Sequence, residues 1–138
     1  MSAIIQHFLQ RPIVALAARI TLTFPFWGSG LAKLSDFDAA MKEMSHFGLE
    51  PAAWFAVATI IVQLTGSLLI VINRLAWLGA GALGVFTGLT ILLVHHFWSI
   101  PEEPFRTIAF HTATEHVGMI GGLVLASILS GRPRPETE

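Results

Sequence analysis

The stretch from residue 52 to residue 94 reads AAWFAVATIIVQLTGSLLIVINRLAWLGAGALGVFTGLTILLV and contains a single charged side chain, Arg74. The Asn73-Arg74 pair divides it into two apolar runs of roughly 20 residues, the length at which a helix crosses a hydrocarbon core of about 30 Å. In lipid the backbone must satisfy its own hydrogen bonds, so both runs are predicted to be helices. The stretch therefore predicts two transmembrane helices joined by a very tight turn.

Two further apolar runs lie on either side of this stretch, one near each end of the chain. Each is again about as long as a helix that crosses the bilayer. We therefore expect an all-α fold, a four-transmembrane-helix bundle that forms a single membrane domain over residues 1–138. The expected spans are at about 12–33, 52–72, 75–98 and 107–129.

The composition of the chain supports a membrane protein and excludes several other classes. Of its 138 residues, 54% are hydrophobic and only 12% are charged, against about 25% charged residues in a soluble domain. A net charge of -1 provides no basic surface for nucleic acid. The chain has no cysteine, which excludes disulfides, iron–sulfur clusters and thiolate metal sites. The lipid bilayer is thus the first expected partner.

Before the first span, apolar residues recur at helical spacing, namely Ile4, Ile5, Phe8 and Leu9. Pro12 then suits the first turn of a new helix. The pattern predicts a short N-terminal helix that lies in the membrane interface.

The basic residues of the short loops set the expected orientation, because they are enriched on the cytoplasmic side. The side with the N-terminus carries Arg11, Arg74, Arg132 and Arg134, and the opposite side carries Lys33, Lys42 and Arg106. This small excess predicts that both termini are cytoplasmic.

Charged residues within the spans are expected to find a partner, since an unpaired charge at mid-bilayer costs about 3 kcal/mol or more. Counting along the helices places Arg19, Gln63 and Glu115 near the middle of the bilayer. We therefore predict a buried ion pair between Arg19 and Glu115, with Gln63 as a neutral hydrogen-bond bridge. Such a pair could carry function, or it could only fix the helix register.

Glycines in the third and fourth spans recur four residues apart, at Gly84 and Gly88 and at Gly118 and Gly122. Small residues at this spacing allow helix backbones to approach closely. The pattern predicts that these spans pack against each other, or against a neighbour, through the four glycines.

Histidines gather toward the non-cytoplasmic end of the bundle, where His95, His96, His111 and His116 approach Lys33. Histidine there could bind a metal or haem, donate to a quinone carbonyl, or carry protons. His95 and His111 continue the glycine stripes of their helices and favour a ligand site, whereas His96 and His116 lie about 100° off these stripes and favour ordinary interfacial roles. The spacing from His111 to Glu115 and His116 does not match a zinc protease motif, so no metal site is predicted.

Several segments resemble the DoxX-like family of small four-span membrane proteins. These segments are FWGSGLAKL at 26–34, QLTGSLLIVINR at 63–74, HHFW at 95–98 and VGMIGGL at 117–123. Their order and spacing carry the resemblance. The family pattern leads us to expect an acidic residue at position 63 and a Lys-Asn pair near Glu115-His116, so this chain departs from it at both places.

The resemblance implies a protein of a bacterial inner membrane that serves as an accessory or subunit of a quinone-linked redox or oxidant-resistance system. In that case Lys33, His95 and His111 would line a pocket for a quinone, with His96, Glu115 and His116 as further candidates; haem is the less favoured cofactor. Two alternatives remain open. The protein could be a structural partner of another membrane complex or form a homo-oligomer, or its polar seam could conduct protons or a small solute. Whether it is an enzyme is left undecided.

Overall fold

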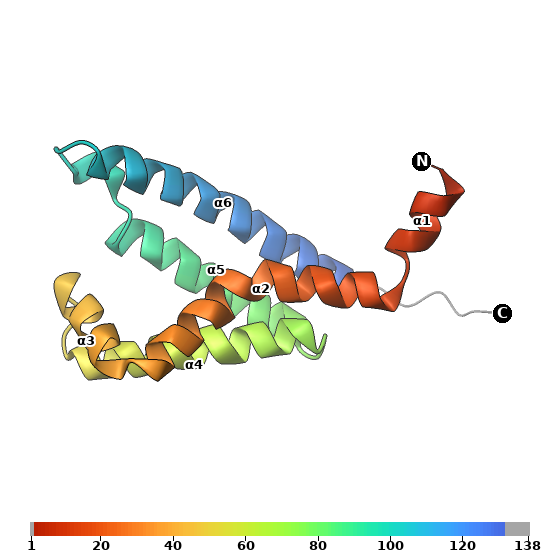
Figure 1. Ribbon diagram of the computed structural model, residues 1–138, viewed down its shortest axis with the longest axis horizontal. Helices are drawn as coiled ribbons and strands as arrows, with labels where there is room; N and C mark the ends of the chain where they lie inside the picture. Colours follow the sequence, from red (N-terminus) through yellow and green to blue (C-terminus); the bar gives the residue numbers. More distant parts are fainter. Residues whose placement is uncertain (1, 132–138) are drawn as a thin grey trace.

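The computed structural model describes residues 2–131, and it is helical throughout apart from short connections. Arg132 and Arg134, which entered the orientation argument, lie outside the described residues. Figure 1 shows the helices in chain order. They are α1 (Ala3–Leu9), α2 (Pro12–Ser35), α3 (Phe37–His46), α4 (Ala52–Val71), α5 (Ala76–Leu93), the short 3₁₀ helix η1 (Phe97–Ser99) and α6 (Phe105–Ser130).

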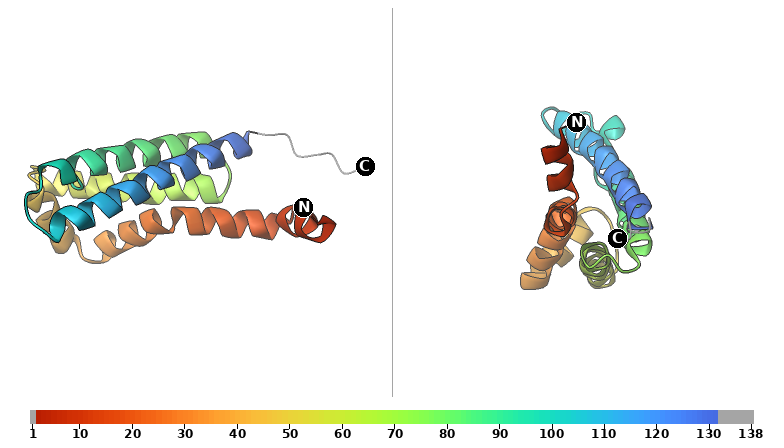
Figure 2. Two further views of the ribbon diagram at one scale, coloured as in Figure 1. Left: turned by 90° about the horizontal axis from the view of Figure 1, so that it is seen from above. Right: turned by 90° about the vertical axis from the view of Figure 1, so that its right-hand side faces the viewer.

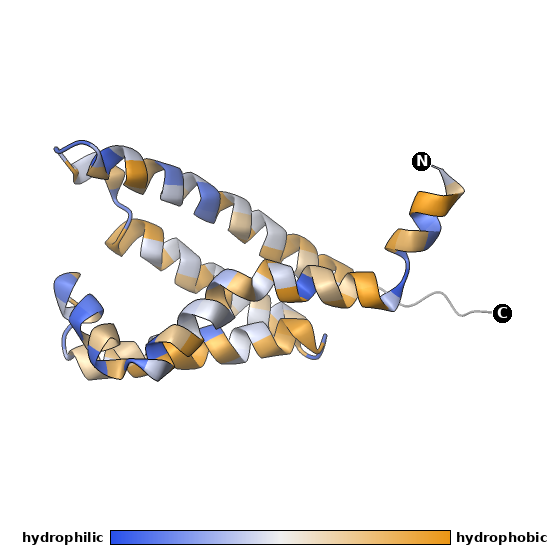
Figure 3. Ribbon diagram, viewed as in Figure 1, coloured by the Kyte–Doolittle hydropathy of each residue, from blue (hydrophilic) through white to orange (hydrophobic). Residues whose placement is uncertain are grey.

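Four of these helices are long and apolar enough to cross a membrane, and they correspond to the four predicted spans. Their outer surfaces are covered with exposed large hydrophobic side chains, such as Ile61, Val85 and Leu125. Figure 3 shows the apolar colouring along the helices and hydrophilic residues in the loops at the end that carries α3. The prediction of an all-α four-helix membrane bundle is therefore confirmed, and the chain is an integral membrane protein.

The short N-terminal helix is also present as predicted. Ser2 caps α1 through a hydrogen bond from the backbone N–H of Ile5 to its side chain, and none of the residues of α1 is buried. Pro12 stands in the first turn of α2, where its missing N–H costs nothing. α1 thus lies apart from the bundle at the end where α2 begins (Figure 1).

The helix of the third span, α5, ends earlier than the predicted limit of that span at residue 98. Its last helical residue is Leu93, and the backbone N–H of His95 then bonds to the carbonyl of Thr90, which closes the final turn. The chain continues as η1 before α6 begins. His95 therefore stands in a connection at the end of α5, not on the helix itself.

The helices form two pairs that diverge from each other. α2 packs along α4 and α5 packs along α6, while α4 also packs against α5 and links the pairs. Figure 1 shows the two pairs meeting near the α4–α5 turn and separating toward α3, and Figure 2 shows the same bundle from two other sides. The main core, with Phe26, Ile70, Leu83 and Leu123, lies where the pairs meet.

The glycines that allow close packing differ from those predicted. A Cβ placed on Gly79 would lie 2.6 Å from the carbonyl oxygen of Gly66, and one on Gly66 would lie 2.8 Å from Leu83 Cγ. By contrast, Gly84, Gly88 and Gly118 have no neighbouring atom within 4 Å of an added Cβ. The prediction that spans three and four pack against each other at these three positions is wrong, because the glycines lie on faces that the neighbouring helix of the chain does not approach. Packing against a neighbouring protein stays a prediction.

The fourth predicted glycine, Gly122, does lie at a helix contact, but with the first span. An added Cβ there would lie 3.0 Å from Leu22 Cδ1 of α2. Gly30 makes a second close approach between spans, since its Cβ would lie 2.8 Å from Leu64 Cδ2 of α4. Close contacts thus join α4 to α5, α2 to α4 and α2 to α6.

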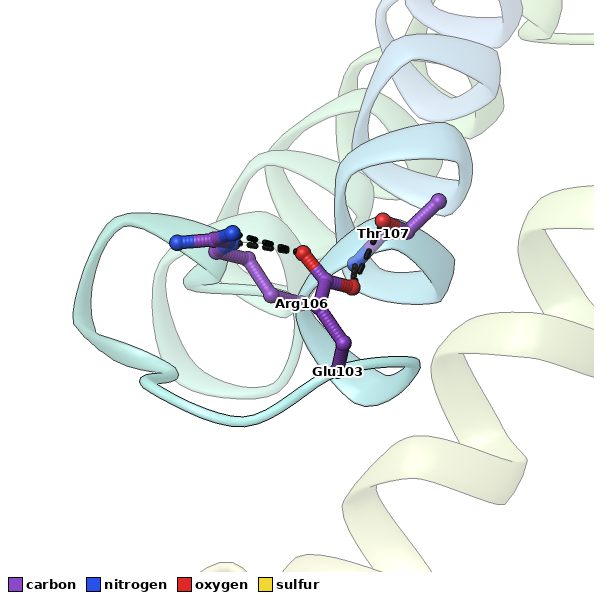
Figure 4. A network of polar contacts seen from close by, with 3 residues as sticks. All are labelled: Glu103, Arg106 and Thr107. Carbon is purple, nitrogen blue, oxygen red and sulfur yellow. Dashed lines mark hydrogen bonds and ion pairs between the residues drawn. The ribbon is translucent and has the colours of Figure 1, made fainter.

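The N-terminus of α6 is stabilised by the side chain of Glu103, which precedes the helix (Figure 4). Its carboxylate accepts hydrogen bonds from the hydroxyl of Thr107 at 2.7 Å, from the backbone N–H of Thr107 at 3.2 Å and from Nε of Arg106 at 2.9 Å. The hydroxyl of Thr107, followed by Arg106, lowers the pKa of the Glu103 carboxyl below its ordinary value. Glu103 therefore acts as an ionised cap on a helix N-terminus.

Substitution of Gly79 by Ala should destabilise the bundle by about 1–3 kcal/mol, because the added methyl group meets a backbone carbonyl that cannot rotate away. Gly88→Ala is the matched control on the same helix, since its methyl group meets nothing within 4 Å. Thermal unfolding in mild detergent measures both variants. Equal stability of the two would contradict the close contact between α4 and α5.

The Glu103 cap should also make the stability of the protein depend on pH. Because its pKa is lowered in the folded state, the stabilisation is complete above the ordinary value of 4.5 and is lost as the pH falls through the lowered value. Glu103→Gln should therefore melt at a lower temperature than the parent at pH 7, and the difference should shrink on acidification. Glu102→Gln, a change at the neighbouring exposed carboxyl, is the control, and a difference that stays constant down to pH 3 would contradict the cap.

Candidate functional site

A cavity of about 670 Å³ lies within the bundle, toward the end that carries α3. Its wall is mainly apolar and aromatic, and it includes Phe26, Phe47, Phe55, Phe86, Met44 and Met119. Polar side chains from all four spans and from α3 interrupt this wall, namely Ser29, Lys33, Glu43, Thr59, Gln63, Thr87, Thr90, His95 and His116. Apolar pockets of this size with a few converging polar groups are typical of sites for small ligands.

Lys33 is the cation of the cavity, and it is paired. Its ammonium group lies 2.8 Å from Oε2 of Glu43 on α3 and donates to the hydroxyl of Ser29 one turn earlier on α2, at 3.2 Å. The Lys33 side chain is 13% exposed, against 45% for Glu43. The charge of Lys33 is thus neutralised at the cavity wall by a residue that the sequence analysis did not single out.

The position of Glu43 follows from the way in which α3 packs. Asp36 caps α3 by accepting a hydrogen bond from the backbone N–H of Ala39. Ala40 and Met44 are buried against Ala56 of α4, which fixes one face of α3 on the bundle. The amphipathic pattern of residues 37–46 signals such a surface helix, but its rotation depends on the packing partner.

His95 and His116 are stacked edge to face, with ring centroids 5.0 Å apart and planes inclined by 75°. They come from the end of α5 and from α6, and both line the cavity. Nδ1 of His116 is buried and has no hydrogen-bond partner among the described residues. The two rings together form one side of the cavity and present nitrogen atoms that can donate or accept.

Gln63 lines the cavity and is only 4% exposed. Among the polar residues of the lining, only Thr87 is more deeply buried. Its Oε1 has no hydrogen-bond partner within residues 2–131. Such a group is costly to bury unless something bonds to it. Gln63 was expected to serve as a bridge in an ion pair, and it lies instead at the cavity with unused hydrogen-bonding capacity.

The predicted ion pair between Arg19 and Glu115 is not formed. Nη1 of Arg19 donates to the carbonyl of Val71 at 3.4 Å, and Glu115 is exposed. The contact between Leu22 and Gly122 sets the register of α2 against α6. From that contact Arg19 and Glu115 lie in opposite directions, so they are about 15 Å apart along the helix axes.

Other predicted site residues are distributed differently from the expectation. His111 is exposed and does not line the cavity, whereas His116, which favoured an ordinary interfacial role, does. His96 is also outside the lining and its ring nitrogen bonds to the hydroxyl of Ser99. Of the three residues predicted to form one pocket, the structure therefore brings Lys33 and His95 to the cavity and leaves His111 outside.

The rotation of α6 about its own axis explains why His116, and not His111, lines the cavity. The buried residues of this helix are Ala109, Ala113 and Leu123, and His116 lies on the same face. The stripe with His111 and Glu115 lies on the opposite face. Within residues 2–131, no cluster of three or more His, Asp or Glu side chains is arranged to hold a metal ion.

Four membrane-crossing helices around a polar-lined cavity define a small integral membrane protein with a hollow inside its helix bundle. Comparison with known families identifies it further. The chain belongs to the DoxX family, whose profile matches residues 14–96, more than half of the chain.

Among curated proteins, the chain is similar to the inner membrane protein YphA of Escherichia coli strain K12. The two are 26% identical over 93 residues, which are 67% of this chain and 66% of that protein. The chain thus spans slightly less than two thirds of the relative's length. No solved structure matches the chain.

The pairing of Lys33 with Glu43 can be tested with a double-mutant cycle. Because Lys33 is largely buried and Glu43 is half-exposed, Lys33→Met and Glu43→Gln should each destabilise the protein, with a coupling free energy of about 1 kcal/mol. Thermal unfolding in detergent measures the four proteins of the cycle. Lys42→Met, which removes an exposed charge from α3, the helix that carries Glu43, is the control and should show no coupling to Glu43→Gln. Purely additive effects of Lys33→Met and Glu43→Gln would contradict the ion pair.

Proposed function

We propose that this protein binds a quinone-class lipophile in the cavity between its two helix pairs and serves as an accessory subunit of a quinone-linked redox or oxidant-resistance system. The observation that carries the proposal is the cavity itself, an apolar and aromatic space of about 670 Å³ into which a few hydrogen-bonding groups converge. A quinone headgroup has the matching properties, since it is a flat, apolar ring with polar atoms at opposite ends.

The charge balance of the cavity favours a neutral ligand over an anion. Lys33 is already compensated by Glu43 at 2.8 Å, so no free positive charge remains there to bind a sulfur oxyanion or a phosphate. The ammonium group and the imidazoles of His95 and His116 can still donate to a carbonyl oxygen. The unpartnered Oε1 of Gln63 can accept from a hydroxyl, the group that a quinone carries when it is reduced.

The wall of the cavity also offers a place for an apolar tail. Phe55 of α4 and Leu89 and Leu93 of α5 line the cavity and are 40%, 48% and 46% exposed. Side chains that border both the cavity and the outer surface of the bundle mark a route between α4 and α5. A ligand could thus place its headgroup among the polar residues and leave its tail in the bilayer.

The cellular setting follows from the family and the relative. YphA is named as an inner membrane protein, and we place this chain in the same membrane. With both termini in the cytoplasm, as the basic residues predict, the cavity lies toward the non-cytoplasmic face. In this proposal a partner enzyme supplies the electrons, and this chain supplies the groups that bind the quinone.

Ligand binding can be tested by titrating decylubiquinone against the purified protein and following the quenching of tryptophan fluorescence. The parent should bind saturably. His116→Ala and Lys33→Met should each weaken binding about fivefold, the effect of one lost hydrogen bond. His111→Ala is the matched control on α6, because this histidine lies outside the cavity, and it should leave the affinity unchanged. Absence of saturable binding to the parent would refute the proposal, as would equal effects of the His111 and His116 variants.

A further inference from the structure

One face of α6 carries polar and small residues although it lies on the outside of the bundle. His111, Glu115 and Gly118 share this face, and all three are exposed. The next residue of the stripe, Gly122, packs on Leu22 of α2, so the uncovered part of the face ends at Gly118. The buried residues Ala109, Ala113 and Leu123 lie on the opposite side of the helix. We call the residues His111, Glu115 and Gly118 the outer α6 face.

Glu115 stands close to the middle of the membrane. α6 runs from Phe105 to Ser130, so Glu115 is about 15 Å from the start of a helix that is about 39 Å long. No hydrogen bond or ion pair joins its carboxylate to another residue of the described chain. Ionisable groups at this depth are costly and normally face protein or water, not hydrocarbon. A single copy of the bundle therefore leaves Glu115 in an unfavourable place.

The outer α6 face is also open to close approach. An added Cβ on Gly118 would meet no atom within 4 Å, and the same is true of Gly121, which borders the face on its outer side. Small residues at such positions let the backbone of a neighbouring helix come near, which is the main source of stability between helices in lipid. The face thus combines a polar group that requires a partner with a surface on which a helix can pack.

We infer that a second copy of this chain covers the outer α6 face, so that the protein is a homodimer with its two α6 helices side by side. Two copies with the same orientation in the membrane are related by a twofold axis along the membrane normal, and their α6 helices then run parallel. The same patch meets itself in such an interface, so residues must be self-complementary. His111 and Glu115 satisfy this condition, since one is a donor and the other an acceptor.

The spacing of these two residues suits the symmetric contact. They are four positions apart, or about 6 Å along the helix, within reach of two long side chains across a parallel pair. His111 of each copy then donates to Glu115 of the other, which gives two equivalent contacts. A different membrane protein could cover the face only with a basic or donor residue of its own at the same depth.

Disulfide cross-linking tests this interface cleanly, because the chain has no cysteine. Leu125→Cys introduces a thiol two turns beyond Gly118, at a position that is 61% exposed. Val85→Cys is the matched control on α5, at a position that is 66% exposed. After oxidation in lipid vesicles, the Leu125→Cys variant should be recovered mainly as a covalent dimer. The yield of covalent dimer from the Val85→Cys variant should be at least fivefold lower.

A second comparison isolates the paired polar residues. In the Leu125→Cys background, Glu115→Leu should weaken dimer formation about tenfold, as expected for two lost intramembrane hydrogen bonds. The exchange His111→Glu with Glu115→His keeps the faces complementary and should restore most of the cross-linked product. Cross-linking that is equal at residues 125 and 85, or that is unaffected by Glu115→Leu, would overturn the inference.

Discussion

The close approach of α4 and α5 at Gly66 and Gly79 is the constraint on which the rest of the bundle depends. Lipid provides no hydrophobic force that drives helices together, so they associate where their backbones can come into close contact. That contact lies near the tight α4–α5 turn, where Asn73 and Leu75 adopt left-handed backbone conformations. The helices are therefore held at one end, and they diverge toward α3, where larger side chains such as Phe55 and Phe86 surround the cavity.

A cavity inside a membrane bundle has to satisfy the polar groups that line it, and the connection between α2 and α4 contributes to this. It folds as α3, whose apolar face packs on α4 through Ala40 and Met44. The same helix then carries Glu43 to the ammonium group of Lys33. The charge of the only lysine at the cavity wall within residues 2–131 is balanced in this way, and Gln63 retains an unused acceptor. The site that results is polar in its hydrogen-bonding groups and close to neutral in charge, which is the basis of the proposed preference for a quinone-class ligand.

The distribution of polar residues on α6 gives the protein two distinct surfaces. Its inner face contributes His116 and Met119 to the cavity. Its outer face carries His111 and Glu115, which the bundle does not enclose. Polar groups within a membrane normally face the inside of a protein, and this rule predicted that His111 and Glu115 would face the inside of the bundle. In the proposed dimer the same two residues are enclosed between two copies of the chain, so the rule holds for the dimer and not for one copy. Ligand binding and association with a second copy can thus be served by opposite sides of a single helix.

The sequence by itself determined the number of spans, the short N-terminal helix and the presence of polar groups within the spans, because these features depend on length and hydropathy, which are local properties of the chain. The sequence also identified Lys33 and His95 as residues near the end of the bundle that carries α3. Only the tertiary structure decided which face of α6 turns inward, why Arg19 and Glu115 do not meet, and that Glu43 reaches Lys33. These features depend on the rotation and sliding of helices, and a change of one residue in register turns a side chain by about 100°. Contacts between distant segments, such as Gly66 with Gly79 and Leu22 with Gly122, fix that register, and a pattern within one helix does not contain them.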